Sequence, residues 1–209
     1  IILSAGPINT NLMPVSTNLS QGMIPVNGKP VISWIIDDLI LKKLTDISVV
    51  VNLEDTHLID FLIKTYSHRI GIKILKISNQ GSIITSLIKG IEQTETTDGV
   101  RIILGDTLIQ DSFEHTQDMV YISEVNETTR WCITELDPNN YISNYIDKGK
   151  ELYSAGLALA GYYHFTNKSH LLKSALNAAK SNATELSSVL SEYSNDYPIK
   201  GIKTNKWYD

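Results

Sequence analysis

The sequence is poor in cysteine, with one in 209 residues, which excludes a framework of disulfide bonds and is typical of a protein in a reducing cytoplasm. It also lacks an uncharged apolar run of about 20 residues, the length that crosses a bilayer, so no membrane span is expected. No Walker A pattern, no G-x-S-x-G and no G-x-G-x-x-G occurs. The interpretations as a P-loop ATPase, an α/β-hydrolase or a dinucleotide-dependent dehydrogenase therefore lose support.

Positive charge is scarce as well, because 18 Lys and Arg stand against 23 Asp and Glu, for a net charge of −5. Binding to a phosphate backbone needs clustered Lys and Arg, so nucleic acid is not an expected partner. Hydrophobic residues make up 42% and charged residues 20% of the chain, which excludes intrinsic disorder. The length is sufficient to bury one full core.

Short apolar, β-branched runs alternate with segments of helical periodicity in the first half of the chain. Strands are predicted at residues 47–51, 70–77 and 100–104, and helices at residues 31–44, 56–66 and 82–93. In the first of these helices the apolar repeat consists of Val31, Trp34, Ile35 and Leu39. Strands that alternate with helices indicate crossover units and parallel pairing.

The pattern changes after Asp106. Shorter strands are predicted at residues 119–125, 131–136, 141–146 and 155–165, two helices at residues 169–180 and 184–193, and one last strand at residues 199–208. The fold class is therefore α/β, a three-layer sandwich with a mixed, mostly parallel central sheet. Open α/β sheets bind ligands at the carboxyl ends of their strands, which directs attention to the turn after Leu3 and to Gly105-Asp106.

Several segments, in order along the whole chain, resemble the sugar-phosphate nucleotidylyltransferases. The opening Ile2-Leu3-Ser4-Ala5-Gly6 and the later Pro25-Val26-Asn27-Gly28-Lys29-Pro30 are similar to that family's glycine-rich signature and to its P-V-x-x-K-P motif. Leu104-Gly105-Asp106 resembles its metal-binding strand end, Ala160-Gly161-Tyr162-Tyr163-His164-Phe165 its A-G-x-Y-x-F strand, and Trp207-Tyr208-Asp209 its late W-x-D. The resemblance implies one nucleotidyltransferase-like domain over residues 1–209, with a nucleotide-binding half (about 1–114) and an acceptor-binding half (about 115–209).

Two signature cations of that family are absent from this sequence. Asn11 stands where the family has its Arg, and Gln21 replaces the Lys of its P-K-x-M motif, whereas Lys29 is retained. Neutral amides bind phosphate more weakly than guanidinium or ammonium groups do. A catalytically altered or inactive module that binds a nucleotide or nucleotide-sugar is therefore the alternative interpretation, as part of a longer multidomain chain.

The activity implied by the resemblance is Mg²⁺-dependent transfer of a nucleotidyl group from a nucleoside triphosphate to a phosphorylated sugar or similar small metabolite. Pyrophosphate is released, and the product serves surface-polysaccharide synthesis. Asp106 and Asp209 would hold the metal, because Mg²⁺ prefers carboxylate and phosphate oxygens, and Asp106 and Lys29 would be catalytic. The sequence leaves open which base and acceptor are used, and whether a C-terminal domain or a second copy of the chain is a partner.

The remaining candidate residues follow from the same resemblance. Backbone N–H groups of a glycine-containing turn can approach a nucleotide, and a Gln side chain can read a base edge. The nucleotide-binding set is Leu3, Ser4, Ala5, Gly6, Asn11, Gln80, Gly81, Ser82 and Gly105, and the acceptor-binding set is Trp131, Gly161, Tyr162 and Glu185.

Two other classes of function fit the residues less well. A glycosyltransferase of related topology usually carries an Asp-x-Asp metal motif, and Asp98-Gly99-Val100 does not match it. A thiol enzyme would need a histidine beside Cys132, and the five histidines are scattered without metal or catalytic spacing.

Overall fold

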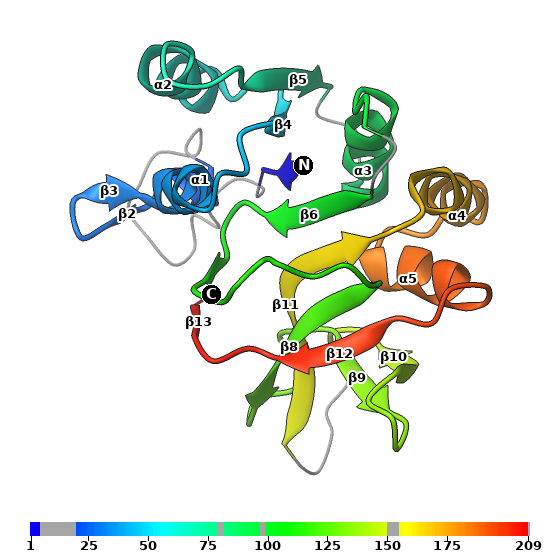
Figure 1. The fold of residues 1–209 in the computed structure, drawn as a ribbon. Helices are drawn as coiled ribbons and strands as arrows, with labels where there is room; N and C mark the ends of the chain where they lie inside the picture. Colours follow the sequence, from blue (N-terminus) through cyan, green and yellow to red (C-terminus); the bar gives the residue numbers. More distant parts are fainter. Residues whose placement is uncertain (5–19, 79–81, 97–98, 150–154, 209) are drawn as a thin grey trace.

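The computed structural model describes residues 1–4, 20–78, 82–96, 99–149 and 155–208, and its centre is a nine-stranded mixed sheet (Figure 1). Along the main path the strand order is β10-β9-β11-β6-β1-β4-β5, and β8 lies between β11 and β12. The strands of this sheet are β1 (Ile2–Leu3), β4 (Ser48–Asn52), β5 (Lys73–Ile77), β6 (Val100–Leu104), β8 (Met119–Val125), β9 (Ile133–Leu136), β10 (Ile142–Ile146), β11 (Gly156–Phe165) and β12 (Lys200–Lys203).

Helices cover the sheet, and two small sheets lie outside it. The helices are α1 (Val31–Leu41), α2 (Thr56–Tyr66), α3 (Ile83–Glu92), α4 (Lys168–Lys180) and α5 (Leu186–Ser194), and a short 3₁₀ turn, η1, spans Gln21–Met23. Strand β2 (Pro25–Val26) pairs with β3 (Lys29–Pro30), and β7 (Leu108–Ile109) pairs with β13 (Trp207–Tyr208). The α/β class with a mixed central sheet is therefore confirmed.

The first half of the chain forms the parallel part of the sheet. Strand β1 lies between β4 and β6 and is parallel to both, so Ile2 is in register with Val49 on one side and with Ile103 on the other. Strand β5 is parallel to β4, and β11 runs antiparallel to β6. The carboxyl ends of β1, β4 and β6 therefore meet at one edge of the sheet.

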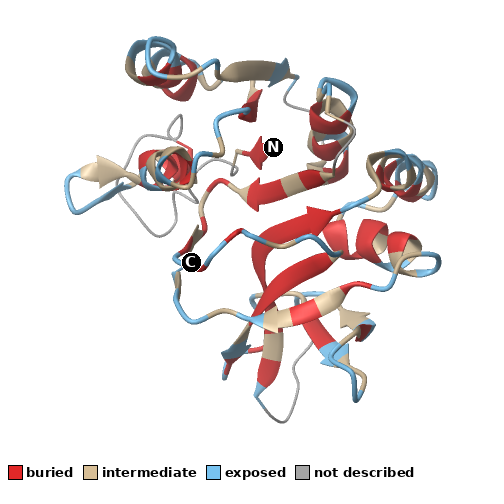
Figure 2. Cartoon of the chain, viewed as in Figure 1, coloured by how far each residue is buried: buried red, intermediate tan, exposed pale blue. Residues whose placement is uncertain are grey.

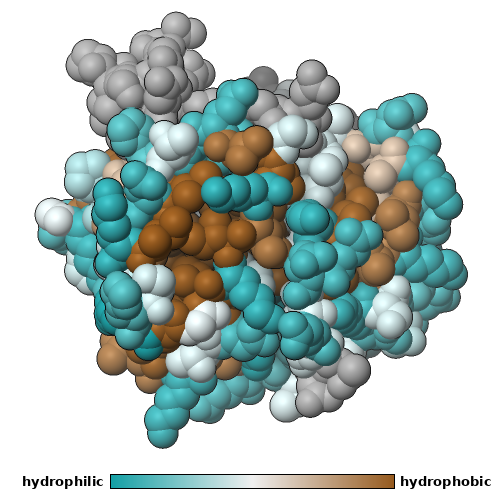
Figure 3. All heavy atoms as spheres, turned by 90° about the horizontal axis from the view of Figure 1, so that it is seen from above, coloured by the Kyte–Doolittle hydropathy of each residue, from teal (hydrophilic) through white to brown (hydrophobic). Residues whose placement is uncertain are grey.

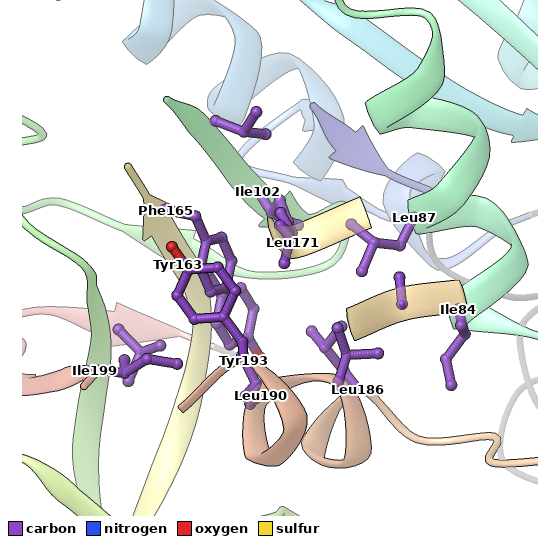
Figure 4. Close-up of a cluster of buried hydrophobic side chains, with 14 of the residues drawn as sticks. Ile84, Leu87, Ile102, Tyr163, Phe165, Leu171, Leu186, Leu190, Tyr193 and Ile199 are labelled. Carbon is purple, nitrogen blue, oxygen red and sulfur yellow. The ribbon is translucent and has the colours of Figure 1, made fainter. Parts of the chain in front are cut away.

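Alternation along these strands divides the core into two layers. Ile2, Val49 and Ile103 pack on the side of α1 and α2, and their neighbours Leu3, Val50 and Ile102 pack on the side of α3, α4 and α5. Because both faces are covered, these strands are buried along most of their length, as Figure 2 shows. Figure 4 shows the second layer, in which Leu87, Leu171 and Tyr193 from the helices surround the sheet residues.

Side-chain caps fix where three helices begin. The carboxylate of Asp55 accepts a hydrogen bond from Leu58 N (3.1 Å) before α2, and the side chain of Asn167 accepts one from His170 N (2.9 Å) before α4. The hydroxyl of Ser82 accepts one from Thr85 N (3.3 Å) before α3. Each cap satisfies a backbone donor that the first turn of a helix leaves without a partner.

The prediction of one last strand over residues 199–208 is wrong. The segment forms two short strands: β12, parallel to β8 in the central sheet, and β13, antiparallel to β7 in a separate sheet. Between them the chain turns at Thr204, Asn205 and Lys206, where Asp111 accepts hydrogen bonds from the side chains of Thr204 and Asn205. The cause of the break is thus a contact with a distant residue.

Of the apolar repeat of α1, Val31, Ile35 and Leu39 are buried, whereas Trp34 is 38% exposed. Its indole N–H donates a hydrogen bond to Val26 O (3.0 Å) and so ties the β2–β3 hairpin to α1. On the face seen from above, hydrophobic residues gather toward the middle and hydrophilic residues lie around them (Figure 3). Within the described residues, no helix is long and apolar enough to cross a membrane.

A bend in β11 brings two distant segments into contact. Leu159 pairs with Ile122 but Tyr163 pairs with Val120, so the register of β11 against β8 shifts between these two positions. Gly161 lies in this bend with φ +82, and a Cβ there would be 2.9 Å from the Thr107 hydroxyl. A glycine is required for both reasons.

We expect Gly161→Ala to lower the free energy of unfolding by about 1–3 kcal/mol, because the left-handed backbone and the contact with Thr107 both oppose a side chain. Gly149→Ala is the control, since Gly149 has φ +90 and a Cβ added there would meet no atom within 4 Å. It should lose only about 1 kcal/mol for the backbone. Urea unfolding followed by circular dichroism measures both variants, and equal losses would contradict the packing argument.

Candidate functional site

The candidate site lies where β1 and β6 end. Gly105 N donates a hydrogen bond to Leu3 O (2.8 Å), and Ser4 N donates one to Val50 O (3.0 Å). These bonds hold Leu3, Ser4 and Gly105 side by side at the carboxyl edge of the sheet, followed directly by Asp106. The side chain of Leu3 is buried in the apolar layer on the side of α3, α4 and α5. Ala5, Gly6 and Asn11 lie outside the described residues.

A second segment approaches this edge without being a strand of the central sheet. Gly22 of η1 lies against Gly105, so close that a Cβ on Gly22 would be 2.9 Å from Gly105 O. Its neighbour Gln21 occupies the position where the resembling family has a Lys. The residue that replaces the missing cation thus belongs to a segment that contacts the candidate site.

Asp106 is a half-buried carboxylate at the end of β6. Electrostatically it acts on Tyr163, whose pKa is raised chiefly by burial and further by Cys132, Tyr145 and Asp106. In the predicted division of the chain, Asp106 belongs to the nucleotide half, and Tyr163 belongs to the acceptor half. Asp106 also lines a cavity of about 590 Å³ together with Lys29 and Tyr208.

Strand β13 brings the end of the chain to this place. Tyr208 pairs with Leu108 and Trp207 pairs with Ile109, immediately after the segment that carries Asp106. Asp209, the second predicted metal ligand, follows Tyr208 and lies outside the described residues. The pairing of the two carboxylates therefore stays a prediction.

The donor chemistry at Asp106 fits a hard divalent cation. In nucleotide sites Mg²⁺ keeps several waters and is bound by one or two carboxylates together with phosphate oxygens, so it needs no cage of protein ligands. Within the described part of the chain, no group of three or more His, Cys, Asp or Glu side chains converges on a point. Asp106 would thus serve as one of few protein ligands.

The positive charge of Lys29 is partly neutralised by an acidic partner. Its ammonium forms an ion pair with Asp37 (2.5 Å) and lies 4.3 Å from the centre of the Trp34 ring. Arg69 binds the same Asp37 carboxylate at 3.0 Å. Burial alone would raise the pKa of Asp37, but the hydrogen bond and charge of Lys29, with the charge of Arg69, hold that pKa below its usual value.

Ser82 has a local role in the structure, the cap of α3 described above. Gln80 and Gly81, the predicted base-reading residues beside it, lie outside the described residues. Contact of this segment with a nucleotide therefore stays a prediction.

On the acceptor side, Tyr162 is fully buried rather than open to solvent. Its ring stacks on Phe113 with 4.3 Å between centroids and lies 5.2 Å from Tyr121. Burial raises the pKa of Tyr162 to about 12. Its ring is a core element that also lines the cavity with Asp106, while Gly161 beside it packs on Thr107.

Trp131 and Glu185, the other predicted acceptor residues, each have partners. Trp131 meets Trp207 edge to face, with 5.3 Å between ring centroids, and Arg130 lies 4.5 Å above the Trp131 ring. Glu185 precedes α5 and forms an ion pair with Lys148 at 3.2 Å. The first pair connects the acceptor half to β13, because Trp207 opens that strand.

Sequence reasoning missed Asp147 and Lys148. Asp147 accepts a hydrogen bond from the Ser187 hydroxyl (2.5 Å), and Lys148 pairs with Glu185. Burial first, and then Asp147 and Glu185, raise the pKa of the Cys132 thiol to about 12, so both carboxylates lie near that thiol and the thiol is unsuited to nucleophilic attack. In the sequence, these two residues could have been noticed as an acidic and a basic residue directly after the strand predicted at residues 141–146.

Curated relatives match the whole of this chain at low identity. The bifunctional protein GlmU of Methanococcus aeolicus is 26% identical over 212 residues, and that of Methanocaldococcus jannaschii is 26% identical over 216 residues. Each match covers 100% of this chain and 50% of the relative, so the chain spans about half the length of the curated relatives it matches.

Solved structures share the fold. CTP:phosphocholine cytidylyltransferase (LicC) from Streptococcus pneumoniae superposes with a TM-score of 0.79 at 18% identity, covering 100% of this chain and 91% of that one. UDP-glucose pyrophosphorylase in complex with UDP-glucose gives a TM-score of 0.79 at 16% identity, with the same coverages. At these identities the likeness concerns the fold alone.

The family assignment itself comes from the sequence. The pattern of the nucleotidyl transferases matches residues 1–209, the whole of the chain. The chain belongs to the nucleotidyl transferase family.

Proposed function

We propose that this chain transfers a nucleotidyl group from a nucleoside triphosphate to a phosphorylated small molecule, with Mg²⁺, and releases pyrophosphate. The observation that carries the proposal is the meeting of three segments at Asp106: the end of β1, the end of β6 and strand β13. A reaction between two phosphorylated substrates needs a metal-binding carboxylate at the border of two binding regions.

In this proposal the strand ends bind the nucleotide. The backbone of Ala5 and Gly6 donates hydrogen bonds to it, and Ser4, whose own N–H is bonded to Val50 O, contacts it beside them. Asn11 adds an amide, Leu3 and Gly105 form the floor, and Gln80, Gly81 and Ser82 contact the base. Bound Mg²⁺ supplies positive charge to the phosphates, and Asp106 and Asp209 are its protein ligands. Lys29, which faces the same cavity as Asp106, contributes charge from its place beside Asp37.

The acceptor binds on the other side of Asp106. Trp131 and Gly161 shape its pocket, Tyr162 supports them from the core, and Glu185 accepts hydrogen bonds from acceptor hydroxyls. Lys148, which is paired with Glu185, is a candidate partner for the acceptor phosphate. In the domain scheme this is the half from about residue 115, and residues 1–114 form the nucleotide half.

The biological setting is inferred from the same resemblance. Proteins of similar fold bear names that include CTP:phosphocholine cytidylyltransferase and UDP-glucose pyrophosphorylase, which differ in both base and acceptor. We infer a cytoplasmic enzyme that makes an activated precursor for surface polysaccharide. Assembly with a C-terminal domain or with a second copy is compatible with relatives of twice the length.

A second candidate function is binding without turnover. Asn11 and Gln21 replace two cations, and the charge of Lys29 is shared with Asp37, which Arg69 also binds. A site with so little positive charge can hold a nucleotide through backbone donors and yet stabilise a leaving pyrophosphate poorly. The two functions differ in whether a bound nucleotide is consumed.

We expect Asp106→Asn to lower pyrophosphate release by at least 100-fold, because the amide removes the negative charge that binds the metal. The assay offers CTP, UTP, dTTP and GTP with several sugar phosphates and phosphocholine, with Mg²⁺ present. Asp60→Asn is the matched control, since Asp60 is an exposed carboxylate on α2. Full activity of Asp106→Asn would refute the role of this carboxylate.

Thermal denaturation separates the enzyme from the binding module. A nucleotide at 100 times its Kd stabilises the folded chain by about 2.7 kcal/mol, which raises Tm by about 5–10 °C at this size. We expect one of the four nucleoside triphosphates to do so, and to do so more strongly with Mg²⁺. Stabilisation without any pyrophosphate release favours the module, and no stabilisation by any nucleotide or nucleoside diphosphate sugar contradicts both functions.

A further inference from the structure

Asp111 is a carboxylate buried to 8% exposure just after β7, in the segment that follows Asp106. Its oxygens accept hydrogen bonds from the hydroxyl of Thr204, from Asn205 N (3.2 Å) and from Asn205 Nδ2 (2.8 Å). A buried charge needs compensation, yet among the described residues no Lys or Arg forms an ion pair with Asp111. The hydrogen bonds that compensate the charge of Asp111 come from neutral donors of one turn.

That turn sets the direction of the chain between two sheets. Directly after β12, Thr204 N donates a hydrogen bond to Ile122 O of β8 (2.9 Å). Lys206 N then donates one to the Thr204 hydroxyl (3.3 Å). Gln110 N donates to Lys206 O (3.1 Å), which adds a contact between the turn and the segment that carries Asp111. The chain therefore leaves the central sheet and is returned to β7 by contacts with residues 110 and 111.

Strand β13 needs this support because its own pairing is short. Trp207 and Tyr208 pair with Ile109 and Leu108 in a two-stranded sheet. A pair of strands this short is marginal without further contacts. The buried carboxylate, which accepts hydrogen bonds from three donors of the turn, anchors the residues directly before this strand.

We propose that Asp111 is a positioning residue for the metal site: it holds the turn at residues 204–206 and so keeps β13 beside the segment that follows Asp106. The inference rests on the proposed function, in which Asp106 and the residue after Tyr208 share a cation. Asp111 does not touch the metal or a substrate. Its effect passes through the position of β13.

Asp111→Asn is the sharpest change, because it keeps the shape of the side chain and removes its charge. The amide of an asparagine has one acceptor oxygen and presents N–H donors to the donors of Thr204 and Asn205, so the turn loses charge-assisted hydrogen bonds. Thr204→Val removes one donor from the other side with little change of volume. It serves as the second variant if Asp111→Asn fails to fold.

Asp118→Asn is the matched control. The Asp118 carboxylate also accepts three hydrogen bonds, from Thr166 N (2.7 Å), the Thr166 hydroxyl (2.9 Å) and the Tyr193 hydroxyl (2.8 Å). These partners belong to the β11–α4 connection and to α5. The control therefore loses a comparable carboxylate network that does not involve β7 or β13.

The experiment uses the full chain and has two readouts besides activity. Hydrogen exchange followed by mass spectrometry reports on residues 204–208, and loss of the electron paramagnetic resonance signal of free Mn²⁺ reports binding of the metal alone. We expect Asp111→Asn and Thr204→Val to speed exchange in this segment and to weaken Mn²⁺ binding about tenfold, with binding restored at higher Mn²⁺ concentration. Asp118→Asn should change neither readout.

The outcomes distinguish this inference from the proposed function. If Asp106→Asn abolishes Mn²⁺ binding but Asp111→Asn and Thr204→Val bind Mn²⁺ as the unchanged chain does, the positioning role is refuted and the metal site stands. If Asp106→Asn itself binds Mn²⁺ normally, the metal site is refuted and the positioning role with it. Weakening by Asp118→Asn as strong as that by Asp111→Asn would reduce the effect to general stability and would also refute the positioning role.

Discussion

The parallel pairing of β1 with both β4 and β6 is the constraint on which the rest of this structure depends. It is visible in one hydrogen bond, from Gly105 N to Leu3 O, which joins residues about a hundred positions apart at the edge of the sheet. Through it, the turn after β1 and the carboxylate of Asp106 become neighbours. The two apolar layers on either side of the sheet stabilise that pairing, because alternate residues of each strand belong to different layers.

The charges around the site are arranged unevenly. Carboxylates are plentiful: Asp106 at the strand end, Asp37 beside Lys29, and Asp147 and Glu185 near Cys132. Among the cations described nearby, Lys29 and Arg69 pair with Asp37, Lys148 pairs with Glu185, and Arg130 lies over the Trp131 ring. A phosphate that enters such a site meets less positive charge than the Arg and Lys of the resembling family would offer, so a divalent cation would have to supply more of it.

Local patterns predicted local structure well and long-range structure poorly. Helix α2 matches the predicted residues 56–66 because its determinants are local: the apolar periodicity lies within the helix, and the Asp55 cap directly precedes it. The prediction of one last strand was wrong because Asp111, almost a hundred residues earlier in the sequence, binds the turn that separates β12 from β13. The contact of the exposed Trp34 is likewise with a different element, because its indole N–H donates a hydrogen bond to Val26 O.

The candidate site shows the same division between what the sequence predicts and what it does not. That Leu3 and Gly105 lie together follows from the rule for parallel sheets, whereas the partners of Lys29, Trp131 and Glu185 are set by packing between distant elements. Side chains such as Asp147 and Lys148 carry no periodic signal, because they follow a strand rather than form one. Their significance appears only when α5 packs beside them.

The central claim is that carboxylates from β6 and from the chain after β13 share one divalent cation. Anomalous diffraction at the manganese edge, from crystals grown with Mn²⁺ and the nucleoside triphosphate that stabilises the chain, tests it most directly. The account predicts one strong peak within about 2.5 Å of oxygens from both Asp106 and Asp209. A manganese peak bound by other residues, with these two side chains on separate surfaces, would contradict it.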